Sequence, residues 1–189
     1  MHELEPYFNW LDLYKASEDA ASPFYGREYS EFEFSDTIYD YFIHPQWDNI
    51  GSITLYVKLL FVNYDIGYCI IELIGEWNDC LYNDIMYLKR NIADTLIENG
   101  VNKFILMGEN VLNFHAEDND YYQEWFDDVE EGWIAFVNFR EHVLTEIEAA
   151  SIDYYVAIGG GLSEVIWQSE TPQKVFDRVN SFIMKRLPA

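Results

Sequence analysis

Carboxylate and amide side chains follow the predicted strands, and they are the residues of this chain best suited to chemistry. We expect strands to end at positions 74, 107, 137 and 158. In an open parallel sheet, ligands bind beyond the carboxyl ends of the strands, so residues just after these ends would share one edge. The candidates for a ligand site at this edge are Glu76, Trp77, Asn78, Glu109, Asn110, Asn138, Arg140, Gly159 and Gly160.

Two carboxylates of this edge, Glu76 and Glu109, could hold a divalent ion or perform acid–base chemistry if burial separated their pKa values. The alternative is a set of solvated loops, with Asp79 capping a helix. The three glycines at 159–161 lack the spacing of a dinucleotide-binding or Walker A loop, so no phosphate site is expected. We assign no catalytic residue, no metal ligand and no cofactor, and the sequence favours binding over catalysis.

A second candidate site is the most acidic stretch of the chain, residues 117–131. The candidate partner-binding residues are His115, just before it, and Glu117, Asp118, Asp120, Glu124, Asp127 and Asp128 within it. The spacing does not fit a calcium-binding EF-hand loop, because Tyr122 stands at the fifth position counted from Asp118. The stretch is either a solvated helix face or a docking surface for a basic protein, whose approach dense charge would steer.

The composition limits the class of partner. The chain has 189 residues, with 11 Lys plus Arg against 34 Asp plus Glu and a formal net charge of -23. Such a charge repels nucleic-acid phosphates and anionic lipid, so we expect neither nucleic acid nor membrane as a partner. An aromatic content of 18% argues against disorder. No signal peptide or membrane span is recognisable, and a cytoplasmic protein is expected.

Hydrophobic periodicity predicts an α/β fold. Alternation at 53–61 and 68–74, with turn residues between, indicates a hairpin. Helices at 81–96, 120–130, 139–150 and from Thr171–Pro172 onward then alternate with strands at 103–107, 133–137 and 152–158. This order predicts a mixed, mostly parallel sheet with one antiparallel hairpin strand and flanking helices.

We expect one domain over residues 1–189, made of an α/β core (53–189) and an aromatic and acidic N-terminal elaboration (1–50). Pro6 fits the first turn of a helix that runs to about Ala16. Residues 31–34 and 38–43 alternate like short strands, although Ser35-Asp36 could instead cap a helix.

Part of the core resembles the STAS domain of anti-sigma-factor antagonists, over about residues 53–158. Ile74-Gly75-Glu76 stands where that family often has a strand end before its first helix. Phe136-Val137-Asn138, followed by Val143, Leu144, Ile147 and Ile152, is similar to a later family segment. Phosphorylatable members carry a serine or threonine in the loop that corresponds to 113–120, and no hydroxyl residue stands there, which argues against a phosphoswitch.

Three functions are consistent with these patterns. The favoured one is a non-enzymatic, protein-binding or regulatory domain that uses an acidic, aromatic-rich surface to bind a protein with a basic face. The first alternative is a small-ligand or divalent-ion binding protein, or an enzyme, that uses Glu76, Glu109 and Asn138. The second is an acidic mimic of nucleic acid. Homodimerisation is left open.

Overall fold

A five-stranded sheet forms the centre of the molecule in the computed structural model, which describes residues 4–186. Its order is β3-β4-β5-β6-β7, with bounds β3 Asp48–Asn49, β4 Leu55–Asn63, β5 Tyr68–Asn78, β6 Lys103–His115 and β7 Trp133–Val137. The pairs β3–β4 and β4–β5 are antiparallel, whereas β5–β6 and β6–β7 are parallel. The mixed α/β fold predicted from the sequence is therefore confirmed.

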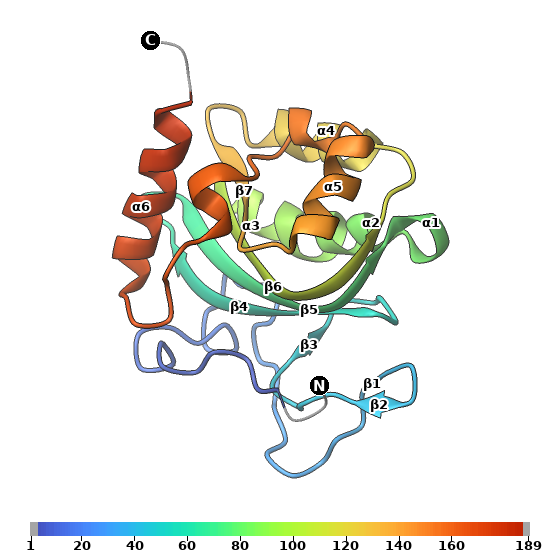
Figure 1. Cartoon of the computed structure of the whole chain (residues 1–189). Coiled ribbons are helices and arrows are strands. Elements are labelled where there is room, and N and C mark those ends of the chain that lie inside the picture. The colour runs from blue at the N-terminus through green and yellow to red at the C-terminus, as the bar shows by residue number, and fades with distance from the viewer. Residues whose placement is uncertain (1–3, 187–189) are drawn as a thin grey trace.

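Helices cover both faces of this curved sheet (Figure 1). The concave face holds α1 (Asp79–Tyr82), α2 (Asp84–Leu88), the π-helical turn η1 (Lys89–Ala93), α3 (Asp94–Glu98), α4 (Asp120–Asp128) and α5 (Glu141–Ala149). Helix α6 (Pro172–Met184) packs against the convex face, and Thr171 caps it as predicted. Within residues 4–186, no helix is long and apolar enough to cross a membrane.

Both faces of the sheet are buried because successive strand residues point to opposite sides. On β4, Leu55, Val57 and Leu59 belong to the core under the helices of the concave face. Tyr56 and Leu60 belong to two smaller clusters on the convex face. The charged residue between them, Lys58, is therefore on the convex face as well, and it is only 7% exposed.

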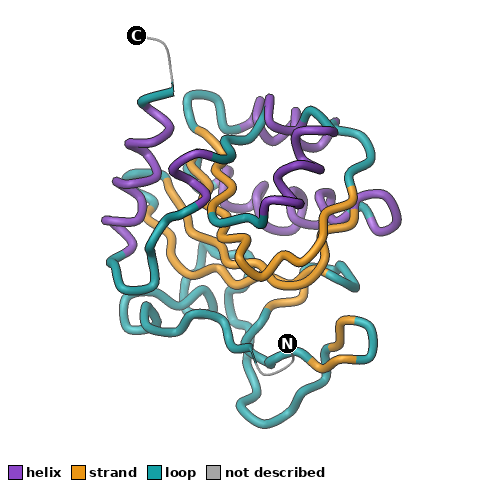
Figure 2. The backbone as a smooth tube through the Cα atoms, in the orientation of Figure 1, coloured by secondary structure: helices purple, strands orange, loops and turns teal. Residues whose placement is uncertain are grey.

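The N-terminal segment, residues 4–36, crosses the convex face as loops and turns (Figure 2). The predicted helix from Pro6 to about Ala16 is wrong. The backbone N–H of Tyr7 donates instead to Glu72 at 2.8 Å, and Trp10 Nε1 donates to the carbonyl of Glu170 at 3.0 Å. These contacts to distant parts of the chain outweigh a weak local helix preference.

The second half of this elaboration contains a small hairpin of two-residue strands, β1 (Thr37–Ile38) and β2 (Tyr41–Phe42). The strand pairing expected at 38–43 is thus present in part. The strand predicted at 31–34 is wrong, because that stretch forms bends and loop.

Two strand ends differ from the sequence prediction. Strand β5 continues to Asn78 and β6 to His115, because their parallel pairing persists to that point across two register shifts. Glu76 and Glu109 therefore lie within strands rather than after them. The predicted strand at 152–158 is wrong: it starts as a 3-10 turn, η2 (Ile152–Tyr154), and pairs with the sheet only through the bridge between Ala157 and Ala135.

Candidate functional site

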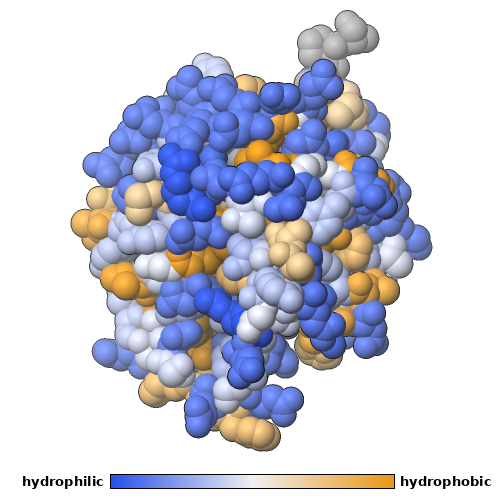
Figure 3. Space-filling model, turned by 180° about the vertical axis from the view of Figure 1, so that it is seen from behind, coloured by the Kyte–Doolittle hydropathy of each residue, from blue (hydrophilic) through white to orange (hydrophobic). Residues whose placement is uncertain are grey.

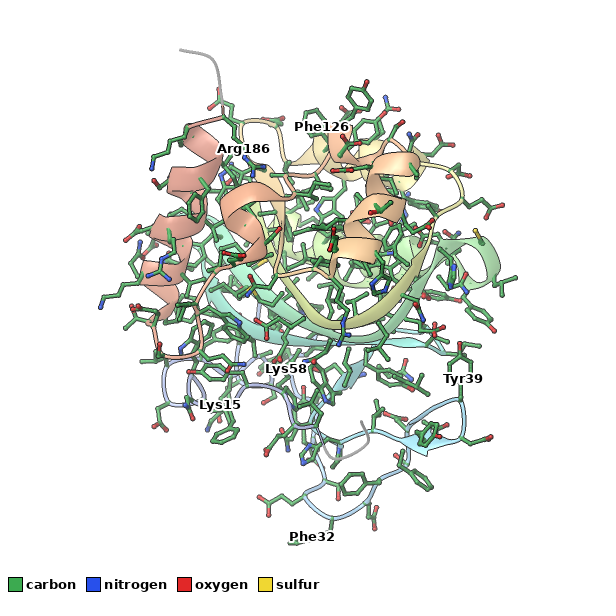
Figure 4. The ribbon with its side chains drawn as sticks, viewed as in Figure 1. Lys15, Phe32, Tyr39, Lys58, Phe126 and Arg186 are labelled. Carbon is green, nitrogen blue, oxygen red and sulfur yellow. The ribbon has the colours of Figure 1, made fainter. Side chains whose placement is uncertain are left out.

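The hairpin and the loop before it form a protrusion that we call the acidic–aromatic arm, residues 28–42. Five of its aromatic side chains are strongly exposed: Phe32 (87%), Phe34 (38%), Tyr39 (61%), Tyr41 (61%) and Phe42 (52%). Five carboxylates lie among them, and residues 28–42 contain no lysine or arginine. The arm extends away from the sheet at the bottom of Figures 1 and 4, with Phe32 at its tip.

The base of the arm is fixed to the sheet. Ile38, Ile43 and Trp47 pack with Tyr56 and Ile74 in a buried cluster on the convex face. The hydroxyl of Tyr39 donates to Glu76, and this bond lowers the pKa of the Glu76 carboxyl while it raises the pKa of Tyr39 to about 12. The exposed aromatic rings of the arm therefore extend from a base that is packed against the sheet.

Among the predicted ligand-edge residues, Glu109 and Asn138 come together. Glu109 Oε1 accepts from Asn138 Nδ2 at 2.8 Å and from Trp167 Nε1 at 2.6 Å. The Asn138 amide also holds both backbone groups of Val165 at 2.8 Å. This network fastens the 159–168 loop to β6 and β7, which is a structural role for both side chains.

Glu76 lies apart from that network, on β5. Besides Tyr39, its carboxylate accepts from Asn113 Nδ2 at 3.0 Å. The carboxylates of Glu76 and Glu109 therefore accept hydrogen bonds from different residues, and no hydrogen-bond donor is common to both.

The remaining ligand-edge candidates occupy varied positions. Trp77 is fully buried in the core, and Asn78 caps α1 by accepting from the Leu81 N–H at 2.9 Å. Arg140 Nε donates to the Glu109 carbonyl at 3.3 Å, and Arg186 donates to the carbonyl of Gly159. Gly160 begins the 3-10 turn η3 (Gly160–Ser163), and Asn110 is half-buried on β6.

Asp79, considered from the sequence as a helix cap, is buried at the start of α1. It accepts from Ile85 N at 2.9 Å, Trp77 Nε1 at 3.0 Å and Tyr122 Oη at 2.6 Å. Burial raises the pKa of Asp79 to about 6, against the lowering effect of these donors. Its contacts connect α1, α2 and α4.

The acidic surface around α4 is partly neutralised. Lys89 Nζ, fully buried, forms ion pairs with Asp94, Glu124 and Asp128, at 3.5 Å for Glu124 and 2.7 Å for Asp128. Arg90 binds Glu124 as well. Two of the predicted partner-surface residues, Glu124 and Asp128, are thus already paired.

The other partner-surface candidates are exposed: His115, Glu117, Asp118, Asp120 and Asp127. The large apolar side chains exposed near them are Phe126 on α4, at 43%, and Leu81 on α1, at 73%. Seen from behind, the upper part of the molecule is largely hydrophilic (Figure 3). Helix α4 itself exposes one large aromatic side chain, whereas the acidic–aromatic arm exposes five.

Lys58 and Glu72 were not singled out from the sequence, although a charged residue inside an apolar strand is a recognisable signal. Glu72 is 6% exposed, and burial raises its pKa to about 7, with a smaller contribution from the charge of Glu109 and an opposing one from the Tyr7 N–H. Both charged groups lie on the convex face, beneath the N-terminal segment.

Two of the solved structures that resemble this chain are forms of one protein. The anti-sigma factor antagonist SpoIIAA in its unphosphorylated form has a TM-score of 0.45 and 13% identity, covering 66% of this chain and 96% of that one. The Bacillus cell fate determinant SpoIIAA in its phosphorylated form has a TM-score of 0.40 and 12% identity, covering 65% and 98%. No protein-family model and no curated protein matches this sequence. Both likenesses concern the arrangement of the backbone.

Proposed function

We propose that this chain is a non-enzymatic protein-binding domain that docks a basic partner through the acidic–aromatic arm. The observation that carries this proposal is the exposure of five aromatic side chains on a stretch that contains five carboxylates and no basic residue. Large exposed aromatic groups are common anchors of protein interfaces, because each buries much apolar area when a partner covers it.

The anchored base of the arm supports this role. Binding by a disordered segment loses conformational entropy, whereas Ile38 and Ile43 already fix the hairpin on Tyr56 and Ile74. Only the tip around Phe32 and the side chains of Tyr41 and Phe42 would need further ordering. A larger share of the interaction energy would then appear as affinity.

Charge supports a basic partner. The arm carries Glu28, Glu31, Glu33, Asp36 and Asp40. A positively charged surface would be attracted to it and to the net charge of -23, while a second copy of the chain would be repelled. We therefore favour a different, basic protein over a homodimer, and the attraction should weaken as salt rises.

The test is capture of partners by three forms of the tagged chain: the wild type, an arm variant and a control variant. The arm variant carries Phe32→Ser, Tyr41→Ser and Phe42→Ser. The control carries Glu117→Gln, Asp118→Asn and Asp120→Asn, so it loses exposed charge near α4. Each form is bound at low salt, eluted with increasing NaCl and compared for basic proteins, and thermal melting verifies that all three fold.

The proposal predicts a basic partner that the wild type and the control capture and the arm variant loses. Loss in the control with retention in the arm variant would move the docking surface to α4. Equal capture by all three folded forms would contradict a role for either surface.

A further inference from the structure

A cavity of about 180 Å³ lies between β4 and the N-terminal segment. Four aromatic residues, Tyr7, Trp10, Tyr14 and Tyr29, line it together with two basic residues, Lys15 and Lys58. An adjoining hollow of about 340 Å³ shares Tyr7, Leu11, Gln46 and Lys58 with it. Figure 4 shows Lys15 and Lys58 on the same side of the sheet as this segment.

Lys58 has capacity for a further bond. Its Nζ donates to the carbonyl of Gln46 at 3.0 Å and lies 3.9 Å from the centre of the Tyr29 ring. An ammonium group has three donors, and these contacts use one of them for a hydrogen bond. No carboxylate among residues 4–186 lies within 4 Å of it. Burial of such a charge is unfavourable unless an opposite charge or an acceptor compensates it.

Burial lowers the pKa of Lys58, and the nearby charges act in opposite directions: Asp48 raises this pKa and Arg27 lowers it. Asp48 is itself held by Arg27 at 2.7 Å and by the Tyr29 hydroxyl at 2.6 Å. Both of these bonds reach Oδ1, so the single carboxylate of Asp48 faces two cations, Arg27 and Lys58. An anion brought to Lys58 would restore the charge balance that burial disturbs.

The distribution of charge around the two hollows indicates where an anion would sit. The smaller cavity has Lys15 and Lys58 in its wall and no acidic residue, whereas Glu5 and Glu31 line the larger hollow. Lys15 is paired with Glu18 at 3.0 Å, which leaves Lys58 as the better donor. The chain has a net charge of -23, but the charged residues that line this cavity are all basic.

We infer that the smaller cavity is a binding site for a small aromatic monocarboxylate, with its ring between Tyr7, Trp10 and Tyr14 and its carboxylate on Lys58 Nζ. The size is appropriate, because a cavity of about 150 Å³ is enough for benzene. Aromatic walls favour a ring through edge and stacking contacts, and a charge-assisted bond to Lys58 selects an acid over an amine. This inference is independent of the acidic–aromatic arm.

The test compares phenylacetate with phenethylamine, which has a similar ring and chain but a positive charge, by titration calorimetry on the full chain. The site predicts that phenylacetate binds at least about tenfold more tightly than the amine. Equal binding of the two compounds, or no binding of phenylacetate at millimolar concentration, would overturn the inference.

A pair of variants locates the site. Lys58→Met keeps the length of the side chain and removes its charge, and it should weaken phenylacetate binding by about tenfold or more. Lys174→Met removes an exposed ammonium group on α6 and should bind like the wild type. Unchanged binding in a folded Lys58→Met variant would contradict the assignment. If that variant does not fold, the comparison of acid and amine on the wild type still decides.

Discussion

Lys58 and Glu72 are direct partners across β4 and β5, both buried on the convex face, yet no ion pair joins them. The Lys58 ammonium group bonds to the Gln46 carbonyl, whereas the Glu72 carboxylate accepts from the Tyr7 N–H. Each charge is held by a different part of residues 4–50. The N-terminal elaboration is therefore built around two buried charged groups, and their protonation should affect stability.

Glu72→Gln should stabilise the protein in alkaline solution. The pKa of Glu72 is raised from its ordinary value of 4.5 to about 7, so the folded state holds this proton more tightly than the unfolded state does. The resulting stability is fully present below pH 4.5 and is lost as the pH rises through 7. The loss amounts to roughly 3 kcal/mol. Denaturant unfolding measures the free energy of unfolding of both proteins. Between pH 4.5 and pH 8.5, the value for the variant should rise relative to that of the wild type by about this amount.

Glu76→Gln is the matched control with the opposite sign. The Tyr39 hydroxyl lowers the pKa of Glu76, so its contribution to stability is present at neutral pH and is lost as the pH falls through its folded pKa. The difference between this variant and the wild type should therefore shrink in acid. A Glu72→Gln difference that does not change with pH would contradict the assignment of the raised pKa.

Lys89→Met should destabilise the chain by about 2 to 3 kcal/mol. Lys89 is fully buried, and its removal leaves the carboxylates of Asp94, Glu124 and Asp128 close together with only Arg90 to balance them. Arg90→Met, which removes an exposed guanidinium, should cost clearly less than Lys89→Met, because solvent screens its ion pairs. Chemical denaturation measures both, and an equal loss in the two variants would contradict a central role for Lys89.

Gly75→Ala should destabilise the sheet by about 3 kcal/mol. Gly75 has φ +116°, and an added Cβ would lie 2.0 Å from the Thr54 carbonyl oxygen and 2.9 Å from Ile38. Gly100→Ala separates the two causes, because Gly100 has φ +92° with no heavy atom within 4 Å of an added Cβ. The difference between their unfolding free energies measures the close approach of β4 and β5. Equal losses would mean that backbone strain alone is at work.

Divalent ions should not raise the melting temperature of the chain by binding to Glu109. Glu109 Oε1 is occupied by Asn138 and Trp167, and Glu76 binds Tyr39 and Asn113 instead. The measurement is thermal melting with Mg²⁺ or Ca²⁺ for the wild type and Glu109→Gln. An ion-dependent rise in the wild type that Glu109→Gln abolishes would restore the ion-binding alternative.

Clear hydrophobic periods made much of the core predictable. The strand Trp133–Val137 has the predicted bounds, and α4, α5 and the start of α6 agree closely with their patterns. The end of β6 was missed because Glu109 and Asn110 interrupt its apolar run. The strand continues past them because β5 supplies a pairing partner as far as His115, which the sequence of β6 alone does not show.

The N-terminal elaboration was less predictable, because distant contacts determine its path. Trp10 bonds to a carbonyl 160 positions away, and Tyr7 to a carboxylate 65 positions away. The acidic–aromatic arm was hard to predict for the same reason. An aromatic and acidic composition was visible at 1–50, but the sequence could not distinguish buried rings such as Trp10 from exposed ones such as Phe32.

Photo-crosslinking from position 32 tests the central claim most directly. A photoreactive phenylalanine analogue replaces Phe32 at the tip of the arm or, in a second protein, the exposed Phe126 on α4, which lies at the opposite end of the molecule (Figure 4). Each protein is irradiated in native lysate at low salt. The account predicts a crosslinked basic protein from position 32 and none from position 126. The same crosslink from position 126 alone, or none from position 32, would contradict docking through the acidic–aromatic arm.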